Sequence, residues 1–339
     1  MQSDKKKITF IDLFAGIGGF HLGIKQAVKK LKMDAKCLLA VDIDEKTRRT
    51  YRRHFKIEES KLLGDITDKG VKDRIPEDVD IICAGFPCQP FSQVGKKLGA
   101  EDDRGTLFEH VVEILKKKKP KAVFLENVRN LANIRNSDGA KTFDVIKNAL
   151  KKAGYPIEGG KLSDNWQNHR IIRATEFGLP THRPRIYMVA FRKDIVADPQ
   201  SFIWPERLHR STPTLAAYFR KLPKNWDTHV ERNGWPECVG STIRVGGVGS
   251  GYRDGGTRRD RRNWDSYMFF KDDDKRRYEH RLTVNEAKAM MGFPLNFKFA
   301  DGLSDPQAMK QLGNSVAVPV IKAIAENIIK TIYDRSDIA

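Results

Sequence analysis

The first half of the chain alternates short apolar runs with segments whose apolar residues recur at helical spacing. Residues 8–14 (ITFIDLF) predict a buried strand, and a glycine-rich turn leads from it into an amphipathic helix, FHLGIKQAVKKL. Further apolar runs that end in glycine or polar residues predict strands at 37–44, 79–85 and 121–128. Strands that alternate with helices indicate an α/β fold, in which a mostly parallel sheet carries helices on both faces.

The patterning changes near Phe191, after a helix predicted at 104–120 and a strand predicted at 185–191. Residues 193–280 contain four of the five tryptophans and show little regular periodicity, which predicts a separate, small and irregular domain. Helical patterning then returns near the C-terminus. The predicted organisation is a first domain at 1–192, a second domain at 193–280 and a C-terminal segment at 281–339 that packs back on the first domain.

Charge and cysteine usage narrow the classes of function. The 62 lysines and arginines outnumber the 44 acidic residues, and the formal net charge is +18. This excess predicts a polyanionic partner such as nucleic acid, with an ordinary charged surface as the alternative. The four cysteines form no CxxC pair or Cys/His cluster, so we expect no metal site and a reducing compartment. We find no signal sequence and no membrane-spanning run, and therefore expect a soluble cytoplasmic protein with no membrane partner.

The glycine-rich turn DLFAGIGGFHLG (12–23) follows the first strand, at the edge of the sheet where parallel sheets bind ligands. Glycines there let the backbone approach a ligand, although they also serve ordinary tight turns. The dinucleotide fingerprint GxGxxG is not met, because His21 occupies the position of its third glycine. Asp42, at the end of the next strand, could accept hydrogen bonds from ribose hydroxyls. These features suit an adenosine-containing cofactor without a pyrophosphate, such as S-adenosylmethionine.

Cys88 lies in GFPCQPFS (85–92), between Pro87 and Pro90, directly after the strand predicted at 79–85. A reactive thiol needs partial exposure and nearby positive potential or helix-terminal amides, and a strand end in the ligand crevice can offer both. The alternative is an inert core cysteine. The glycine-bearing segment that follows, QVGKKLGAEDDRG, is expected to act as a mobile lid.

Glu126 closes the apolar run AVFLEN, where burial would raise its pKa and leave it able to donate a hydrogen bond near neutral pH. A capping or ion-paired carboxylate is the alternative. Arg183 and Arg185 lie two residues apart before and within a predicted strand, so they share one face. Together they could hold an anion or a carbonyl oxygen, whereas a single ion pair is the simpler interpretation.

Six motifs, in their order along the chain, resemble the motif series of the DNA cytosine-5 methyltransferases of bacterial restriction-modification systems. They are DLFAGIGGF, GFPCQPFS, ENV, RPRIYMVAF, RLTVNEAKAMMGFP and QLGNSVAVP, and they cover nearly the whole chain except roughly 193–280. The resemblance implies the Rossmann-like fold of S-adenosylmethionine-dependent methyltransferases. It also implies methyl transfer from S-adenosyl-L-methionine to C5 of a cytosine flipped out of duplex DNA, through a covalent adduct between Cys88 and C6.

The resemblance also implies roles for individual residues. Cys88 matches the nucleophile, and Glu126 matches the carboxyl group that engages N3 and the exocyclic amine of cytosine. Arg183 and Arg185 match arginines near the base and the catalytic cysteine. The implied cofactor-binding residues are Phe14, Ala15, Gly16, Gly18, Gly19, Asp42, Ile43, Asp65, Ile66, Pro87, Asn314 and Ser315. The implied DNA-binding residues are Gln89, Ser92, Thr242, Ile243, Arg244 and Arg258.

Within this set, Asp42 matches the ribose acceptor, Ile43 an adenine-packing position and Asp65 a group near the adenine amine. Two residues depart from the family pattern. Thr181 stands where glutamine is usual, and Ile43 is smaller than the aromatic residue often found there. These departures leave the contacts of Thr181 and the strength of adenine packing open.

The resemblance identifies 193–280 as a target-recognition domain and duplex DNA as the partner. It further implies a monomer on the nucleoid of a bacterial cytoplasm, with a cognate restriction endonuclease that acts separately. Two alternatives remain. An RNA cytosine-5 methyltransferase of the same fold is disfavoured because the chain lacks the tripeptide CFT, and a non-catalytic DNA-binding protein because Cys88 and Glu126 are present.

Overall fold

The computed structural model describes most of the chain. The described residues are 6–87, 107–135, 139–157, 169–196, 201–208, 211–223, 237–240, 242–243, 267–271 and 277–333. The predicted site residues Cys88, Gln89, Ser92, Arg244 and Arg258 lie outside them, as does the segment predicted to form a lid.

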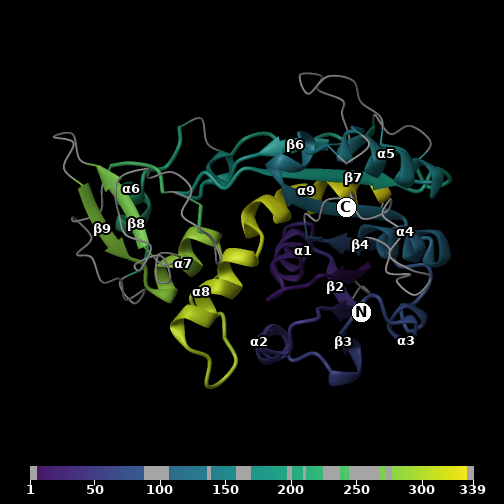
Figure 1. Cartoon of the computed structure of the whole chain (residues 1–339), viewed down its shortest axis with the longest axis horizontal. Helices are drawn as coiled ribbons and strands as arrows, with labels where there is room; N and C mark the ends of the chain where they lie inside the picture. The colour runs from purple at the N-terminus through teal and green to yellow at the C-terminus, as the bar shows by residue number, and fades with distance from the viewer. Residues whose placement is uncertain are drawn as a thin grey trace.

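The central element of the described chain is a seven-stranded sheet with strand order β3-β2-β1-β4-β5-β7-β6 (Figure 1). The first five strands pair in parallel, whereas β7 pairs antiparallel with both β5 and β6. The strands are β1 Lys7–Leu13, β2 Asp34–Val41, β3 Leu62–Leu63, β4 Ile81–Ala84, β5 Ala122–Val128, β6 His169–Ile172 and β7 Arg185–Phe191. The predicted mostly parallel sheet is therefore confirmed. The hydrophobic pattern did not predict β3 and β6, which are short strands at the two edges.

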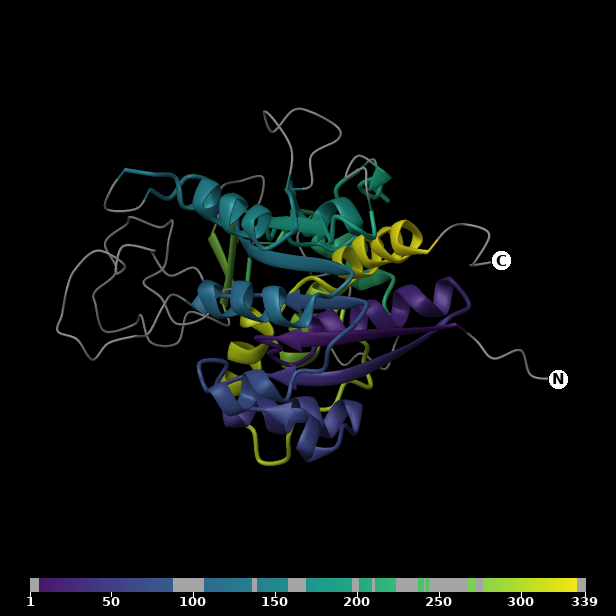
Figure 2. The same ribbon diagram turned by 90° about the vertical axis from the view of Figure 1, so that its right-hand side faces the viewer.

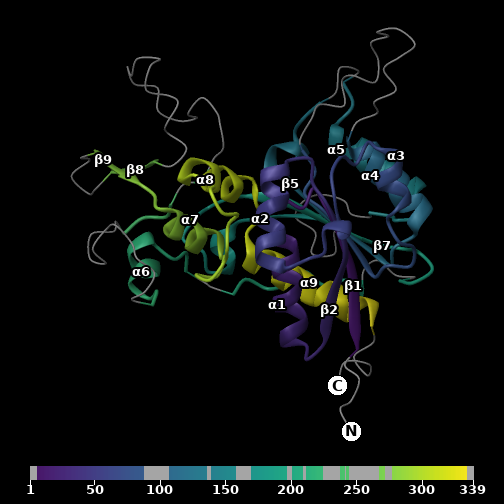
Figure 3. The same cartoon turned by 90° about the horizontal axis from the view of Figure 1, so that it is seen from below.

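Helices cover both faces of this sheet, which is why its inner strands are continuous apolar runs. Ile8 and Phe10 of β1 belong to the apolar core under α1 and α9, whereas Ile11 and Leu13 belong to the core under α4 and α5. Figure 3 shows α1 and α9 on one side of the strands and α4 and α5 on the other. The helices with their bounds are α1 Gly19–Lys30, α2 Glu45–Phe55, α3 Lys69–Asp73, α4 Leu107–Lys118, α5 Thr142–Lys152 and α9 Val318–Ile332.

The last helix packs closely against the first. Figure 2 shows α9, in yellow, beside α1, in purple. A Cβ atom at Gly23 would lie 2.6 Å from Cγ2 of Ile321, so only glycine permits this approach. The stretch Asp305–Ile332 is long and apolar enough to cross a membrane, but 78% of its apolar part is buried inside the molecule, as in a core helix. The helical patterning near the C-terminus corresponds to separate helices, among them α8 Asp305–Asn314 and α9, which Ser315 separates.

A third apolar core extends from Ile17 and Leu22, around the start of α1, to the elements before α9. It joins Leu215 and Phe219 of α6 to Ile243, to Met290 of α7 and to Leu312 of α8. The region of irregular patterning contains α6 and the antiparallel pair β8–β9, which lie away from the seven-stranded sheet in Figure 1. The remaining elements are η1 Glu59–Lys61, η3 Arg129–Ala132, η4 Ala174–Phe177, α6 Leu215–Arg220, β8 Tyr267–Lys271, β9 Arg277–Arg281, α7 Val284–Met291 and α8 Asp305–Asn314.

Candidate active site

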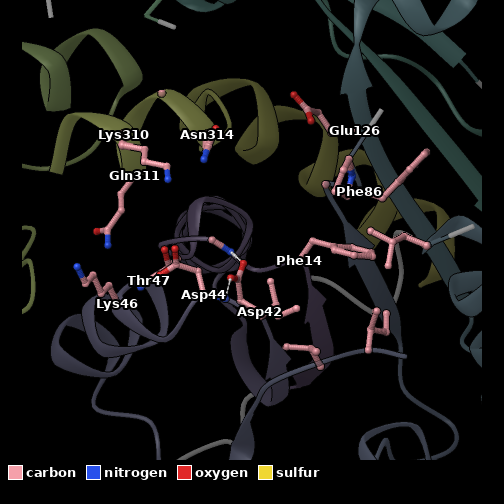
Figure 4. A pocket seen from close by; sticks show the side chains of 18 of the residues that line it. Phe14, Asp42, Asp44, Lys46, Thr47, Phe86, Glu126, Lys310, Gln311 and Asn314 are labelled. Carbon is pink, nitrogen blue, oxygen red and sulfur yellow. Dashed lines mark hydrogen bonds between the residues drawn. The ribbon is translucent and has the colours of Figure 1, made fainter. Parts of the chain in front are cut away.

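A cavity of about 930 Å³ opens beyond the carboxyl ends of the parallel strands (Figure 4). The predicted residues that line it are Phe14, Gly16, Asp42, Ile43, Asp65, Ile66, Pro87, Glu126, Arg183, Arg185 and Asn314. Predicted cofactor-binding and predicted catalytic residues thus share one cavity, at the edge of the sheet where parallel sheets bind ligands. The predicted cofactor residues that do not line it are Ala15, Gly18, Gly19 and Ser315.

Gly18 and Gly19 support the cavity from behind. Gly18 precedes α1 with a φ of 83°, and a Cβ atom there would lie 2.2 Å from the ring of Phe55. A Cβ atom at Gly19 would lie 2.6 Å from Val316 and 2.7 Å from the hydroxyl oxygen of Ser315. These glycines therefore let the turn after β1 pack against α2 and against the chain that precedes α9.

Asp42 holds this turn while it faces the cavity. Its carboxylate accepts hydrogen bonds from the backbone N–H of Gly16 at 2.8 Å and from that of Asp44 at 2.9 Å. Burial raises the pKa of Asp42 above its ordinary value, although these two hydrogen bonds and the nearby Arg48 act in the opposite direction. Ile43 beside it is 73% exposed, so a ligand in the cavity can cover it.

Glu126 lies in the buried part of β5 and pairs with Arg185 at the start of β7. The distance from Nε of Arg185 to Oε1 of Glu126 is 3.1 Å, and 8% of Glu126 is exposed. Burial raises the pKa of Glu126, and the charges of Arg185 and Arg183 oppose this effect only in part. A carboxyl group with a raised pKa is partly protonated nearer neutral pH, where it can donate a hydrogen bond.

Arg183 lines the same cavity but is committed to the protein backbone. It is 2% exposed, and its guanidinium donates to the carbonyl oxygens of Ile243 at 3.3 Å, Gly313 at 2.9 Å and Ser315. Burial lowers the pKa of Arg183 to about 9, and the charge of Arg185 contributes to this shift. Arg183 thus joins three chain segments, whereas Arg185 holds Glu126.

Sequence reasoning missed a second residue of the ENV motif. Asn127 is 2% exposed, and its amide donates to the carbonyl oxygen of Phe86 at 2.9 Å. This contact fixes the backbone directly before Pro87, which is the last described residue before Cys88. The signal was present, because the motif was recognised but only its carboxylate was assigned a role.

Two helices contribute lining residues that the sequence analysis did not single out. On α8, Gln307, Lys310, Gln311 and Asn314 recur at helical spacing, which could have revealed one helix face directed at the cavity. Figure 4 shows the labelled residues of this face opposite those of α2. The lining residues from the start of α2 and the residue before it are Asp44, Glu45, Lys46 and Thr47.

Two predicted DNA contacts lie within the described residues, and they differ in exposure. Thr242 is partly exposed, whereas Ile243 is 4% exposed and packs in the third apolar core. Ile243 therefore has a packing contact instead of an open face for a base. Thr181, where the chain departs from the family pattern, is buried and forms a parallel bridge with Gly240.

Comparisons with known proteins agree with this geometry. Residues 8–330 match the family model described as C-5 cytosine-specific DNA methylase. The chain is 37% identical to the type II methyltransferase M1.ScrFI of Lactococcus lactis subsp. cremoris, over 96% of this chain and 79% of that protein. It is 35% identical to M.HpaII of Haemophilus parainfluenzae, over 98% and 92% of the two chains.

Solved structures share the fold at lower sequence identity. A DNMT2 variant of Spodoptera frugiperda superposes with a TM-score of 0.62 at 18% identity, covering 95% of this chain and 99% of that chain. The methyltransferase EhMeth of Entamoeba histolytica superposes with a TM-score of 0.59 at 20% identity, covering 97% and 99%. At these identities the comparison concerns the fold alone.

Proposed function

Because the chain belongs to the C-5 cytosine-specific DNA methylase family, we propose that its Glu126–Arg185 pair activates the target cytosine and that Cys88 attacks it. The chain is a DNA (cytosine-5)-methyltransferase, EC 2.1.1.37, of the type II restriction-modification kind. Its methyl donor is S-adenosyl-L-methionine. One observation carries the proposed roles: the buried pair opens into the same cavity as Asp42, directly beside the segment that leads to Cys88.

The lining of the cavity fits this donor. Asp42 offers a carboxylate to ribose hydroxyls, and Asp65 offers one to an exocyclic amine. The adjacent apolar wall suits an adenine ring. The residues that would hold the donor are Phe14, Gly16, Asp42, Ile43, Asp65, Ile66, Pro87 and Asn314, with Ala15, Gly18, Gly19 and Ser315 supporting them from behind. When bound, S-adenosyl-L-methionine supplies an electrophilic methyl group.

The protein residues make the cytosine able to react. C5 of cytosine is a poor nucleophile, so the thiolate of Cys88 adds to C6 while Glu126 donates to N3. This addition moves electron density to C5. Arg185 orients the Glu126 carboxyl group, and Arg183 holds the segments around it. After methyl transfer, loss of the C5 proton expels the thiolate of Cys88 and restores the aromatic ring.

Access to C6 requires the cytosine to leave the base stack, since both faces of a stacked base are covered in duplex DNA. The net charge of +18 supports binding to the phosphates. We assign the catalytic domain to 1–192, the target-recognition domain to 193–280 and the returning C-terminal segment to 281–339. The candidate DNA contacts are Gln89, Ser92, Thr242, Arg244 and Arg258, whereas Ile243 packs in the third apolar core.

The relatives also suggest a cellular setting. They are type II methyltransferases of bacteria, which supports a place in the bacterial cytoplasm, on the nucleoid. We propose that the enzyme acts as a monomer, because each event modifies one cytosine. A cognate restriction endonuclease would act separately on the same DNA sequence.

The test is bisulfite sequencing of plasmid DNA from a methylation-free host that expresses the chain, with Cys88→Ser and Glu126→Gln as variants. Protection of cytosines in one short DNA motif is expected only with the intact chain. A protected motif with Cys88→Ser would overturn the nucleophile assignment. Full protection with Glu126→Gln at low expression would overturn the role of the buried carboxyl group.

A further inference from the structure

Arg48 reaches back from α2 to the segment that forms one wall of the cavity. Its Nη1 atom donates to the carbonyl oxygen of Asp42 at 2.7 Å and to that of Ile43 at 2.9 Å. One nitrogen therefore holds two successive peptide units. Both residues line the cavity, and neither carbonyl group is part of a strand.

The same guanidinium lies near Gly64, which lines a second wall of the cavity. A Cβ atom at Gly64 would lie 3.6 Å from Nη1 of Arg48, and Gly64 immediately precedes the lining residues Asp65 and Ile66. Arg48 is half-buried, and within the described part of the chain no carboxylate lies within ion-pair distance of it. An arginine whose guanidinium donates to backbone carbonyl groups, and not to an acidic side chain, is suited to holding the backbone in one conformation.

We propose that Arg48 is a positioning residue for the cofactor, which fixes the Asp42–Ile43 segment that receives the adenosine part of S-adenosyl-L-methionine. This inference rests on the proposed assignment of the cavity. Arg48 acts through its two neighbours and does not itself line the cavity. Its loss should therefore weaken cofactor binding and leave the chemical step unchanged once the cofactor is saturating.

The electrostatic effect of Arg48 gives a second readout. The charged groups close to Asp42 are Arg48, the carboxylate of Asp44 at the start of α2 and the buried Asp12 of β1. The backbone N–H of Asp44 lowers the pKa of Asp42 by hydrogen bonding, the charge of the Asp44 carboxylate raises it, and the charge of Arg48 lowers it. Without Arg48 the pKa of Asp42 rises, so the carboxylate that accepts from ribose becomes protonated at a higher pH. Three further titratable residues line the cavity, and they are unchanged in a variant that lacks Arg48: Glu45, Lys46 and Asp65.

The experiment is calorimetric titration of the full chain with S-adenosylhomocysteine and with 5′-methylthioadenosine, which lacks the amino-acid part. Arg48→Met should raise Kd for both ligands roughly 10-fold at an unchanged 1:1 stoichiometry, equivalent to about 1.4 kcal/mol. Arg48→Lys should restore part of the affinity. The matched control is Arg52→Met, one turn along α2, where the arginine pairs with exposed Glu59 at 2.8 Å. Its Kd should equal that of the wild type.

The pH profile completes the test. As the pH is lowered, Arg48→Met should lose affinity at a higher pH than the wild type does, and its rate at saturating cofactor should be unchanged. Equal Kd values for Arg48→Met and wild type would overturn the inference and leave the cavity assignment intact. A loss confined to S-adenosylhomocysteine would overturn it as well, because Arg48 would then contact the amino-acid part. Failure of the wild type to bind either ligand would instead refute the cavity assignment. If Arg48→Met does not fold, the Kd of Arg48→Lys decides, and a value equal to that of the wild type would overturn the inference.

Discussion

Replacing Arg183 by methionine tests whether this buried cation holds the active site together. Its guanidinium is the shared donor for the carbonyl oxygens of Ile243, Gly313 and Ser315. A buried carbonyl that loses its partner costs about 1–3 kcal/mol, so three would cost roughly 3–9 kcal/mol. Removing the charge offsets part of this cost, because burying one ion costs on the order of several kcal/mol. We expect a net loss of about 2–4 kcal/mol in the free energy of unfolding.

The assay is urea unfolding followed by circular dichroism, with the midpoint and the slope m measured for each variant. Arg183→Lys keeps the charge but not the planar set of donors, so its loss should lie between those of wild type and Arg183→Met. The control is Arg52→Met, whose ion pair with Glu59 is exposed and should contribute less than about 1 kcal/mol. A loss for Arg183→Met no larger than that of this control would refute the reasoning.

Three further predictions concern single contacts. Asn127→Ala leaves the buried carbonyl of Phe86 without its donor, so we expect about 1–3 kcal/mol lower stability and slower single-turnover methyl transfer at unchanged cofactor affinity; an unchanged rate would contradict this. Burial alone would raise the pKa of Asp80, but its hydrogen-bond donors, Tyr333 among them, hold the pKa below its ordinary value. This stabilisation is present above the unfolded pKa of about 3.9 and is lost as the pH falls through the lower folded value. Tyr333→Phe should therefore lower the stability by about 1 kcal/mol at neutral pH and weaken the acid dependence of the urea midpoint. A variant whose urea midpoint changes with pH in parallel with that of the wild type would argue against the contact. Gly18→Ala would place a Cβ atom 2.2 Å from an aromatic ring at a φ of 83°, so we expect a loss of roughly 1–3 kcal/mol and a lower melting temperature; wild-type stability would show that the turn is not constrained.

The longer strands of the sheet could be predicted from the sequence, although the edge strands β3 and β6 could not and the run predicted at 37–44 is β2, Asp34–Val41. The run RIYMVAF coincides with β7, Arg185–Phe191, and the run at 121–128 contains β5, Ala122–Val128. Asp42 and Glu126 were recognised because they follow or close apolar runs, and in a parallel sheet such positions meet at one edge. The antiparallel direction of β7 was not predicted, since hydrophobic periodicity carries no information on strand direction.

The missed contacts join residues that are far apart in the chain. Arg183 donates to Gly313 across 130 residues and to Ile243 across 60. Asn127 reaches Phe86 across 41 residues. Each partner is a backbone carbonyl group, which every residue possesses, so residue types alone cannot identify it.

The sequence by itself determined the class of fold, the family and the chemical groups available to the site. Hydrophobic periodicity and motifs are local properties of the chain, and they can be read from neighbouring residues without the tertiary structure. The tertiary structure decided which of these groups face the cavity and which support it. Gly18 and Gly19 proved to be packing positions, Ile243 is covered by a core, and Arg183 is held by carbonyl groups. These outcomes depend on how α2, α8 and α9 pack around the strand ends. The burial that results determines which hydrogen-bond partners each charged group has and shifts its pKa.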